Sequence, residues 1–542
     1  MIVPPNDLKH HPHSKSLHST TKRKKTAPVS LTLGDRDLAP AQLWEFAIRA
    51  NIIDETFPIE IGRKAIRAVN EANEFLNKLV ESGEPFYGIN TGFGYFADRT
   101  VNGDQLIELQ TNIIRSHCCN VGTPLPRDLT MGMWLVTLNK LVQGHSGIRL
   151  EILETITRML RRGILAVVPS RGSVGASGDL SPSAHVARAL LGEGLCTVGS
   201  DDGFIVISAA EALEMIGTKP ITLGPKEGLS LINGTALSTV LAIRAWYEGK
   251  CLLKVANAAA ALAYEVLGIS DKTFHPSVLG AHRHRGTAEI GNDLSLYFDD
   301  KKSELRIQHN GKEWIQDPYS FRCVPQVHGA VWEELHHAEQ TLTDELNATT
   351  DNPLLFPDEM AVYNCGHFHA IYPARVCDKL ASALTTLASI SERRINHAMC
   401  PKRGCLPTFL VENGGVNSGF MMAHVTAAAL VSESQSLSFP ASVNSIPTNI
   451  QQEDHVSMGP IAGFKAWQIV NHLRDVLAIE LLCMAQALDL QRPRRTTMKL
   501  EQLWQRIRGI VPKLENDRAL SEDIQAISEA IANGEIVDFE ME

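Results

Sequence analysis

The segment at residues 472–490, HLRDVLAIELLCMAQALDL, limits the fold more than any other, because it is apolar nearly all the way round a helix. Such a helix is stable only when other elements cover every side of it. Two more segments, 148–160 and 376–394, carry apolar residues at amphipathic-helix spacing. Alternating strand patterns are few, and they lie mostly before residue 230 and around SELRIQ at 303–308. The sequence therefore predicts a mainly α-helical protein, a long helical bundle preceded by a more irregular N-terminal region.

The chain of 542 residues divides into three predicted parts. Residues 1–28 form a basic, histidine-rich tail, whose core from Lys9 to Lys25 has almost no hydrophobic side chain. We expect this tail to be disordered, because it cannot bury enough surface to offset its ordering entropy. Its four histidines are read either as a solvated tail or as a weak metal-binding tract. An N-terminal domain is expected over residues 29–235 and a helical-bundle domain over 236–542.

Composition excludes several classes of partner. The net charge of -10 argues against nucleic acid as the main ligand, and no apolar run reaches the roughly 18 residues of a membrane span. Ten cysteines without a C-x-x-C pair and the absence of a secretory signal favour a reduced, cytoplasmic protein. Cys118-Cys119, His367-x-His369 and CPKRGC lack the paired spacing of a zinc site, so no metal is expected.

The run GSVGASGDLSPSAH at 172–185 contains small residues and few reactive ones. It lacks the lysine of a phosphate-binding loop, and Asp179 stands where a nucleophile elbow needs glycine. In Ala176-Ser177-Gly178, however, the Gly178 nitrogen can reach the Ala176 carbonyl carbon, because glycine has no Cβ to block the approach. Loss of the Ser177 hydroxyl as water then leaves a methylidene group on a five-membered ring. A plain structural bend is the alternative.

This run resembles the signature of the histidine and aromatic amino acid ammonia-lyase family, and the likeness extends from about Leu31 to about Arg492. The other blocks that carry it are FYGINTGFG, LQTNIIRSH, LINGTALST, IQDPYSFRCVPQVHGA, ATTDNPL, VNSGFMMAHVTAAAL and QQEDHVSM. The resemblance implies a 4-methylidene-imidazol-5-one group formed autocatalytically from Ala176, Ser177 and Gly178, with no external cofactor. It also implies the all-helical ammonia-lyase and fumarase-like architecture, in a homotetramer whose active sites are shared between subunits.

Each block supplies a residue whose role the resemblance implies. Tyr87, in a glycine-rich loop, resembles the base that removes a β-proton, which requires surroundings that favour its phenolate. Asn233 would lie beside the prosthetic ring and orient the amine. Arg322 would bind the substrate carboxylate through two parallel hydrogen bonds. The remaining catalytic or substrate-binding candidates of the family pattern are Gln316, Tyr319 and Phe368.

Two positions bear on the substrate side chain. His117 resembles a residue of the lyases that act on histidine, and Glu453 stands where many phenylalanine lyases carry glutamine. A histidine and a carboxylate suit an ionisable imidazole, whereas a phenyl ring would leave both groups buried without partners. The implied reaction is elimination of ammonia from the small-molecule substrate L-histidine, which gives trans-urocanate. Alternatively, both side chains are satisfied core groups.

The sequence departs from the usual family pattern at Ser183, His367 and Ala370, and Ile371-Tyr372 adds bulk beside Phe368. These positions leave other substrates open. A 2,3-aminomutase, a tyrosine or phenylalanine lyase, and a relative that keeps the fold without the prosthetic group are the alternatives.

Overall fold

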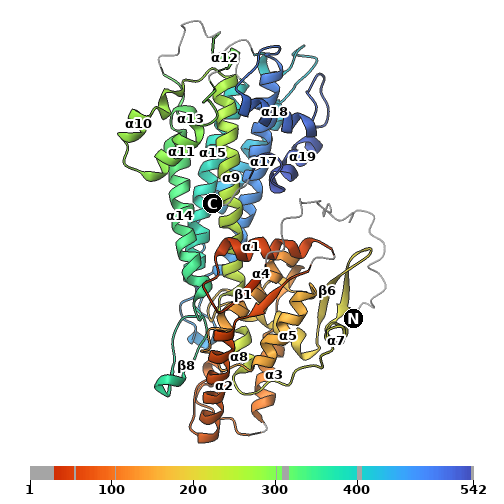
Figure 1. The fold of residues 1–542 in the computed structure, drawn as a ribbon, viewed down its shortest axis with the longest axis vertical. Helices are drawn as coiled ribbons and strands as arrows, with labels where there is room; N and C mark the ends of the chain where they lie inside the picture. The colour runs from red at the N-terminus through yellow and green to blue at the C-terminus, as the bar shows by residue number, and fades with distance from the viewer. Residues whose placement is uncertain are drawn as a thin grey trace.

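A computed structural model describes residues 30–53, 56–103, 105–300, 302–307, 316–399 and 406–538. Long helices stand side by side in a bundle that occupies one half of the elongated molecule, and an N-terminal region of shorter helices and small sheets occupies the other (Figure 1). The mainly helical prediction is confirmed. The predicted tail at residues 1–28 and the CPKRGC segment at 400–405 lie outside the described residues.

The N-terminal region alternates helices with short strands. Its helices are α1 (Pro40–Ala47), α2 (Arg63–Ser82), α3 (Gln105–His117), α4 (Arg127–Leu141), α5 (Leu150–Arg161), α6 (Leu180–Arg188), α7 (Ala209–Met215) and α8 (Glu227–Ile232). Its strands are β1 (Leu31–Leu33), β2 (Ile59–Ile61), β3 (Val121–Pro124), β4 (Leu165–Ala166), β5 (Pro169–Arg171), β6 (Leu195–Ser200) and β7 (Gly203–Ser208). β1 pairs with β2 in parallel, β3 with β5 antiparallel, and β6 lies between β4 and β7 in an antiparallel sheet.

The bundle is built from the C-terminal part of the chain. Its helices are α9 (Ala236–Val266), α10 (Pro276–Gly280), α11 (Arg285–Ser295), α12 (Glu304–Ile307), α13 (Tyr319–Arg322), α14 (Val324–Asn347), α15 (Ile371–Ala398), α16 (Met421–Leu437), α17 (Gly459–Asp489), α18 (Met498–Ile510) and α19 (Ser521–Ala532). The antiparallel strands β8 (Leu354–Phe356) and β9 (Ala361–Tyr363) form a small extension.

The central helix of the bundle is α17, as the apolar segment at 472–490 predicts. Every residue of α17 from Val476 to Asp489 is buried. The pattern at 376–394 lies within α15, which packs along α17, and the pattern at 148–160 corresponds to α5. Charged groups also lie inside the bundle, where Arg394 of α15 forms a fully buried ion pair with Glu480 of α17.

The prediction of a strand at SELRIQ is wrong. Residues Glu304–Ile307 form a single helical turn, α12, whose first N–H donates to the Arg495 carbonyl oxygen. Four residues of alternating polarity cannot distinguish a strand from one turn of helix. Among the described residues, no helix combines the length and the apolar character needed to cross a membrane.

The length of α15 separates two groups of candidate residues. At its first residues, the Ala370 N–H contacts the Gly175 carbonyl oxygen, 3.5 Å away. At its last turn, the His397 ring lies 5.6 Å from the ring of Phe321, which belongs to α13. A helix of 28 residues that rises about 1.5 Å per residue spans about 40 Å. The loop around Gly175 and helix α13 therefore lie at opposite ends of the bundle.

Candidate active site

The Ala176-Ser177-Gly178 triplet lies in a tight loop between β5 and α6. Gly178 has φ of +73°, and a Cβ on it would lie 2.1 Å from the Gly234 carbonyl oxygen. The same oxygen accepts a 2.7 Å hydrogen bond from the Asp179 N–H. Only glycine fits at position 178, because both the backbone angle and the close neighbour exclude a side chain.

Several long helices begin at this loop. The contacts that place their first residues there are Asp179 with Ser238 for α9, Gly175 with Ala370 for α15, and Val174 with Met458 for α17, while α6 follows directly at Leu180. The N-terminus of a helix carries a partial positive charge. Negative charge that develops at the loop is therefore stabilised by the fold itself.

Asp179 fixes the triplet loop to helix α9 by hydrogen bonds. Its fully buried carboxylate accepts hydrogen bonds from the Ser238 N–H at 2.7 Å, from the Ser238 hydroxyl at 3.1 Å and from the Ser173 hydroxyl at 3.0 Å. Burial raises the pKa of Asp179 to about 6, although these hydrogen bonds oppose the shift. The loop is thus fixed to α9 through a single carboxyl group.

Ser177 and Glu453 are joined directly. The Ser177 hydroxyl donates a 2.9 Å hydrogen bond to Oε1 of Glu453, and Oε2 accepts one of 2.6 Å from the Thr448 hydroxyl. Glu453 therefore lies directly beside the serine of the triplet.

Tyr87 lies close to the same carboxylate. Its hydroxyl accepts a 3.3 Å hydrogen bond from the Gly94 N–H, which closes the glycine-rich loop on itself. Burial raises the pKa of Tyr87, the Gly94 bond lowers it, and the charge of Glu453 raises it again. The expectation of surroundings that favour phenolate is therefore not met within one chain, because burial outweighs the single N–H donor.

His117 ends α3 and also lies within the field of Glu453. Burial lowers the pKa of His117, while a hydrogen bond to the Ile113 carbonyl and the charge of Glu453 raise it. Nδ1 lies 2.8 Å from that carbonyl oxygen, so Nδ1 carries the proton and donates. The other ring nitrogen, Nε2, is then an acceptor, as is the nearby carboxylate.

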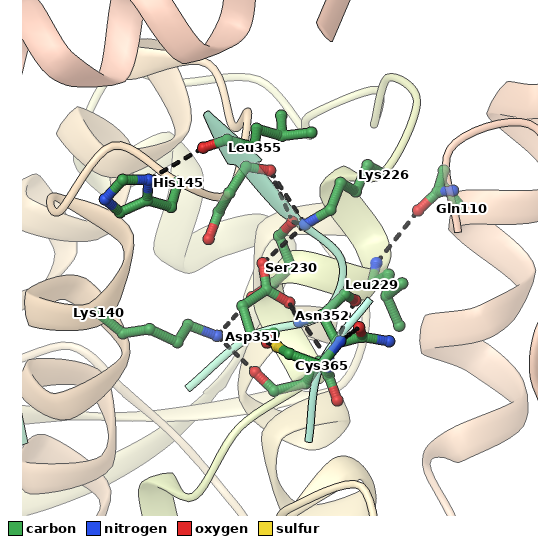
Figure 2. Close-up of polar contacts among 12 residues, drawn as sticks. Gln110, Lys140, His145, Lys226, Leu229, Ser230, Asp351, Asn352, Leu355 and Cys365 are labelled. Carbon is green, nitrogen blue, oxygen red and sulfur yellow. Dashed lines mark hydrogen bonds and ion pairs between the residues drawn. The ribbon is translucent and has the colours of Figure 1, made fainter. Parts of the chain in front are cut away.

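Asn233 stands directly after α8 and contacts a buried cluster of charges, of which Figure 2 shows Lys140, Lys226 and Asp351. Its side-chain amide donates to the Asp351 carboxylate at 3.3 Å and to the Asn352 carbonyl at 3.2 Å. Asp351 forms a fully buried ion pair of 2.7 Å with Lys226, and Lys140 donates to the Asn233 carbonyl oxygen at 2.5 Å. Burial raises the pKa of Asp351, but the nearby lysines dominate and hold it at about 2.

The lysines of this cluster are absent from the sequence-based list of site residues. Lys140 lies in the apolar segment MWLVTLNKLV, where the helix pattern indicates only core packing. A lysine in such a segment is a usable signal, since lysine is almost never fully buried unless it is paired. Asp351 belongs to the ATTDNPL block, which gave it no separate role.

Gln316, Tyr319 and Arg322 are not brought to Ser177 within one chain. They lie in and just before α13, at the far end of the bundle. Tyr319 is 70% exposed, and its ring lies 4.7 Å from the Arg322 guanidinium carbon. The Arg322 Nε atom is buried and has no hydrogen-bond partner among the described residues.

Phe368 and the positions that depart from the family pattern lie near the start of α15. Phe368 is partly buried in the loop that precedes this helix, and His367 beside it is exposed. Ala370 is fully buried, and its Cβ packs against Gly175 next to the triplet. Ser183 is buried in α6.

Across the described residues, no group of three or more His, Cys, Asp or Glu side chains is placed so that it could hold a metal ion.

A long helical bundle with a glycine-rich serine loop at one end defines an enzyme of the helical lyase class. The profile of the aromatic amino acid lyase family matches residues 45–509. The chain is 44% identical to a histidine ammonia-lyase of Symbiobacterium thermophilum, over 86% of this chain and 91% of that one.

Solved structures agree with this match. A histidine ammonia-lyase from Trypanosoma cruzi superposes with a TM-score of 0.85 at 38% identity, and the match covers 94% of both chains. A phenylalanine aminomutase from Pantoea agglomerans superposes with a TM-score of 0.86 at 29% identity, over 94% of this chain and all of that one. The chain belongs to the aromatic amino acid lyase family. It is a carbon–nitrogen lyase, which confirms the prediction from its sequence blocks.

Proposed function

We propose that this enzyme eliminates ammonia from L-histidine and releases trans-urocanate. The observation that carries the proposal is the placement of Glu453, which accepts a hydrogen bond from Ser177 while its charge acts on His117. The imidazole ring of histidine presents an N–H donor, and this site offers two acceptors, the Glu453 carboxylate and Nε2 of His117. The names of the related lyases support the same substrate.

The residues of the triplet fit a 4-methylidene-imidazol-5-one group. Gly178 has no Cβ to obstruct its nitrogen, and the Ser177 hydroxyl, which would leave as water together with the Cα proton, lies against the Glu453 carboxyl group. Ala176, Ser177 and Gly178 would form the group, with no external cofactor. Its chemistry is that of an electrophile that activates the substrate amine for departure.

The side chains around the triplet then have separate tasks. Tyr87 takes the β-proton of the substrate, and Asn233 orients the amine. Arg322 holds the substrate carboxylate with Nε and a second N–H, since its Nε has no hydrogen-bond partner among the described residues. A guanidinium brought close to Tyr87 also lowers the pKa of that phenol, which burial alone raises. Arg322 thus serves both binding and proton removal.

The separation of these groups supports an active site that is shared between subunits, as in the expected homotetramer. Arg322 lies about 40 Å from the triplet of its own chain, so it reaches a triplet only in another chain. Large apolar side chains are also exposed on and beyond α16, as expected of a surface that a second copy covers. They are Met422, Val425, Phe439, Val443 and Ile446. No disulfide joins the cysteines of the described part of the chain, which supports the proposal of a cytoplasmic enzyme.

A product assay with L-histidine tests the proposal. Release of urocanate with ammonia is the expected result. The likeness to the Pantoea agglomerans enzyme makes a 2,3-aminomutase the second candidate. An aminomutase would instead form β-histidine without net release of ammonia. Failure to convert histidine, together with turnover of phenylalanine or tyrosine, would overturn the proposal.

A further inference from the structure

Lys140 and Lys226 are two buried lysines that share one carboxylate. Lys140 is 4% exposed and Lys226 is fully buried, and Asp351 is the acid between them. When all three are ionised, the cluster carries one net positive charge. A buried excess charge destabilises the folded state unless hydrogen bonds satisfy it. The hydrogen-bond partners of the two lysines therefore decide where this charge lies.

The two lysines make different contacts. Lys226 donates to Asp351, to the Ser230 hydroxyl and to the Ser146 carbonyl. Lys140 donates instead to backbone carbonyls at the end of α8, to that of Ser230 at 2.7 Å (Figure 2) and to that of Asn233 at 2.5 Å. The excess charge is therefore aimed at the peptide that joins Asn233 to Gly234.

The carbonyl side of that peptide faces Lys140, and its N–H side faces the triplet. Its N–H, which belongs to Gly234, points at the Ser177 carbonyl oxygen from 3.5 Å, and the Gly234 carbonyl accepts from the Asp179 N–H. An ammonium bound to the oxygen of a peptide polarises the whole group and makes its N–H a stronger donor. The Ser177 carbonyl is thus connected to Lys140 through a single peptide.

We propose that Lys140 is a positioning residue that acts through the Asn233–Gly234 peptide on the Ser177 carbonyl oxygen. This rests on the proposed prosthetic group, in which that carbonyl is conjugated to the methylidene carbon. Electron density moves onto the Ser177 oxygen when a nucleophile adds to that carbon. The Gly234 N–H stabilises this charge, and Lys140 both fixes the N–H in place and strengthens it. Lys226 holds Asp351 and does not contact this peptide.

Addition of 2-mercaptoethanol to the purified enzyme tests this without substrate. The thiolate adds to the methylidene carbon, the adduct takes up the proton, and the ultraviolet absorbance of the conjugated group disappears. Lys140→Met should slow this loss of absorbance by about tenfold, since removal of a direct oxyanion donor costs roughly a hundredfold or more. Lys226→Met is the matched control, because it removes the same buried charge, and its rate should fall by no more than about threefold.

Intact mass separates the possible failures. If the wild-type chain shows no deficit of two water molecules, the proposed prosthetic group is wrong. If wild type and both variants carry the deficit and both variants react alike, the role of Lys140 is wrong. Lys140→Gln, which keeps a neutral donor, should give a rate between those of wild type and Lys140→Met.

A measurement on the wild-type protein covers the case in which these variants do not fold. Burial lowers the pKa of Lys140 to about 8, with Asp351 raising it and Lys226 lowering it further. The addition rate per thiolate should therefore fall as the pH rises from 7 to 9, because the ammonium loses its proton. A rate per thiolate that stays constant over this range would contradict the inference.

Discussion

The Ser177 hydroxyl donates a 2.9 Å hydrogen bond to the Glu453 carboxylate across 276 positions of sequence. This contact joins the loop between β5 and α6 to the segment that leads into α17, so it exists only when the bundle has closed. Folding therefore places Ser177, which in the proposed group would lose its hydroxyl and its Cα proton together as water, beside a carboxyl group. Formation of the prosthetic group should accordingly require the folded chain.

Replacement of Ser177 tests the prosthetic group. The wild-type chain should have a mass lower than its sequence mass by two water molecules, one from cyclisation and one from the serine. Ser177→Ala should lack the serine water and the ultraviolet absorbance, and should lose activity by more than about a thousandfold. Ser181→Ala, a few residues further along, is the control and should keep both properties. A folded, active wild-type protein with the plain sequence mass would rule the group out.

Mixed chains test the shared site. Tyr87→Phe and Arg322→Ala should each be nearly inactive, but chains mixed and reassembled should recover up to about a quarter of the activity, because some sites receive both intact residues. The matched control mixes Tyr87→Phe with Glu453→Gln. These two residues lie together in one chain, so every site lacks one of them and no recovery is expected. A fully active monomer in light scattering would refute the shared site.

The sequence predicts the bundle well and the site in part. Helix α17 follows from local pattern alone, because an all-apolar helix must be central. The family pattern names Tyr87, His117 and Glu453, and the structure places the first two within the field of the Glu453 carboxylate, but their roles stay predictions. The separation of Arg322 from Ser177 does not follow from sequence, since it depends on how far α15 extends between them. Lys140 was missed for a similar reason, because its partners are backbone carbonyls, which no motif records.

Glu345 should make stability depend on pH. Burial raises the pKa of Glu345 to about 7, the Thr235 hydroxyl lowers it, and the charge of Asp179 raises it. The folded state thus holds a proton that the unfolded state releases near pH 4.5, so stability from this group is present below that pH and is lost as the pH rises through 7. Glu345→Gln should gain up to about 3 kcal/mol relative to wild type between pH 5 and pH 8.

Unfolding midpoints in urea at several pH values measure this gain. Glu334→Gln on the same helix is the control and should follow the wild type. A wild-type and Glu345→Gln pair whose midpoints differ by the same amount at pH 5 and pH 8 would show that the carboxyl is already ionised at the lower pH.

Substrate choice depends on His117 and Glu453. A site built from hydrogen-bond acceptors rejects an apolar ring, because its own polar groups then lose their partners. L-Histidine should be preferred to L-phenylalanine by about 3 kcal/mol or more, on the order of a hundredfold in kcat/KM. The double change His117→Phe with Glu453→Gln should narrow or reverse that preference. Tyr87→Phe should slow both substrates alike, since proton removal does not depend on the ring. Faster turnover of phenylalanine or tyrosine by the unaltered enzyme would instead make Ile371 and Tyr372, which is 65% exposed at the start of α15, the residues that select the substrate.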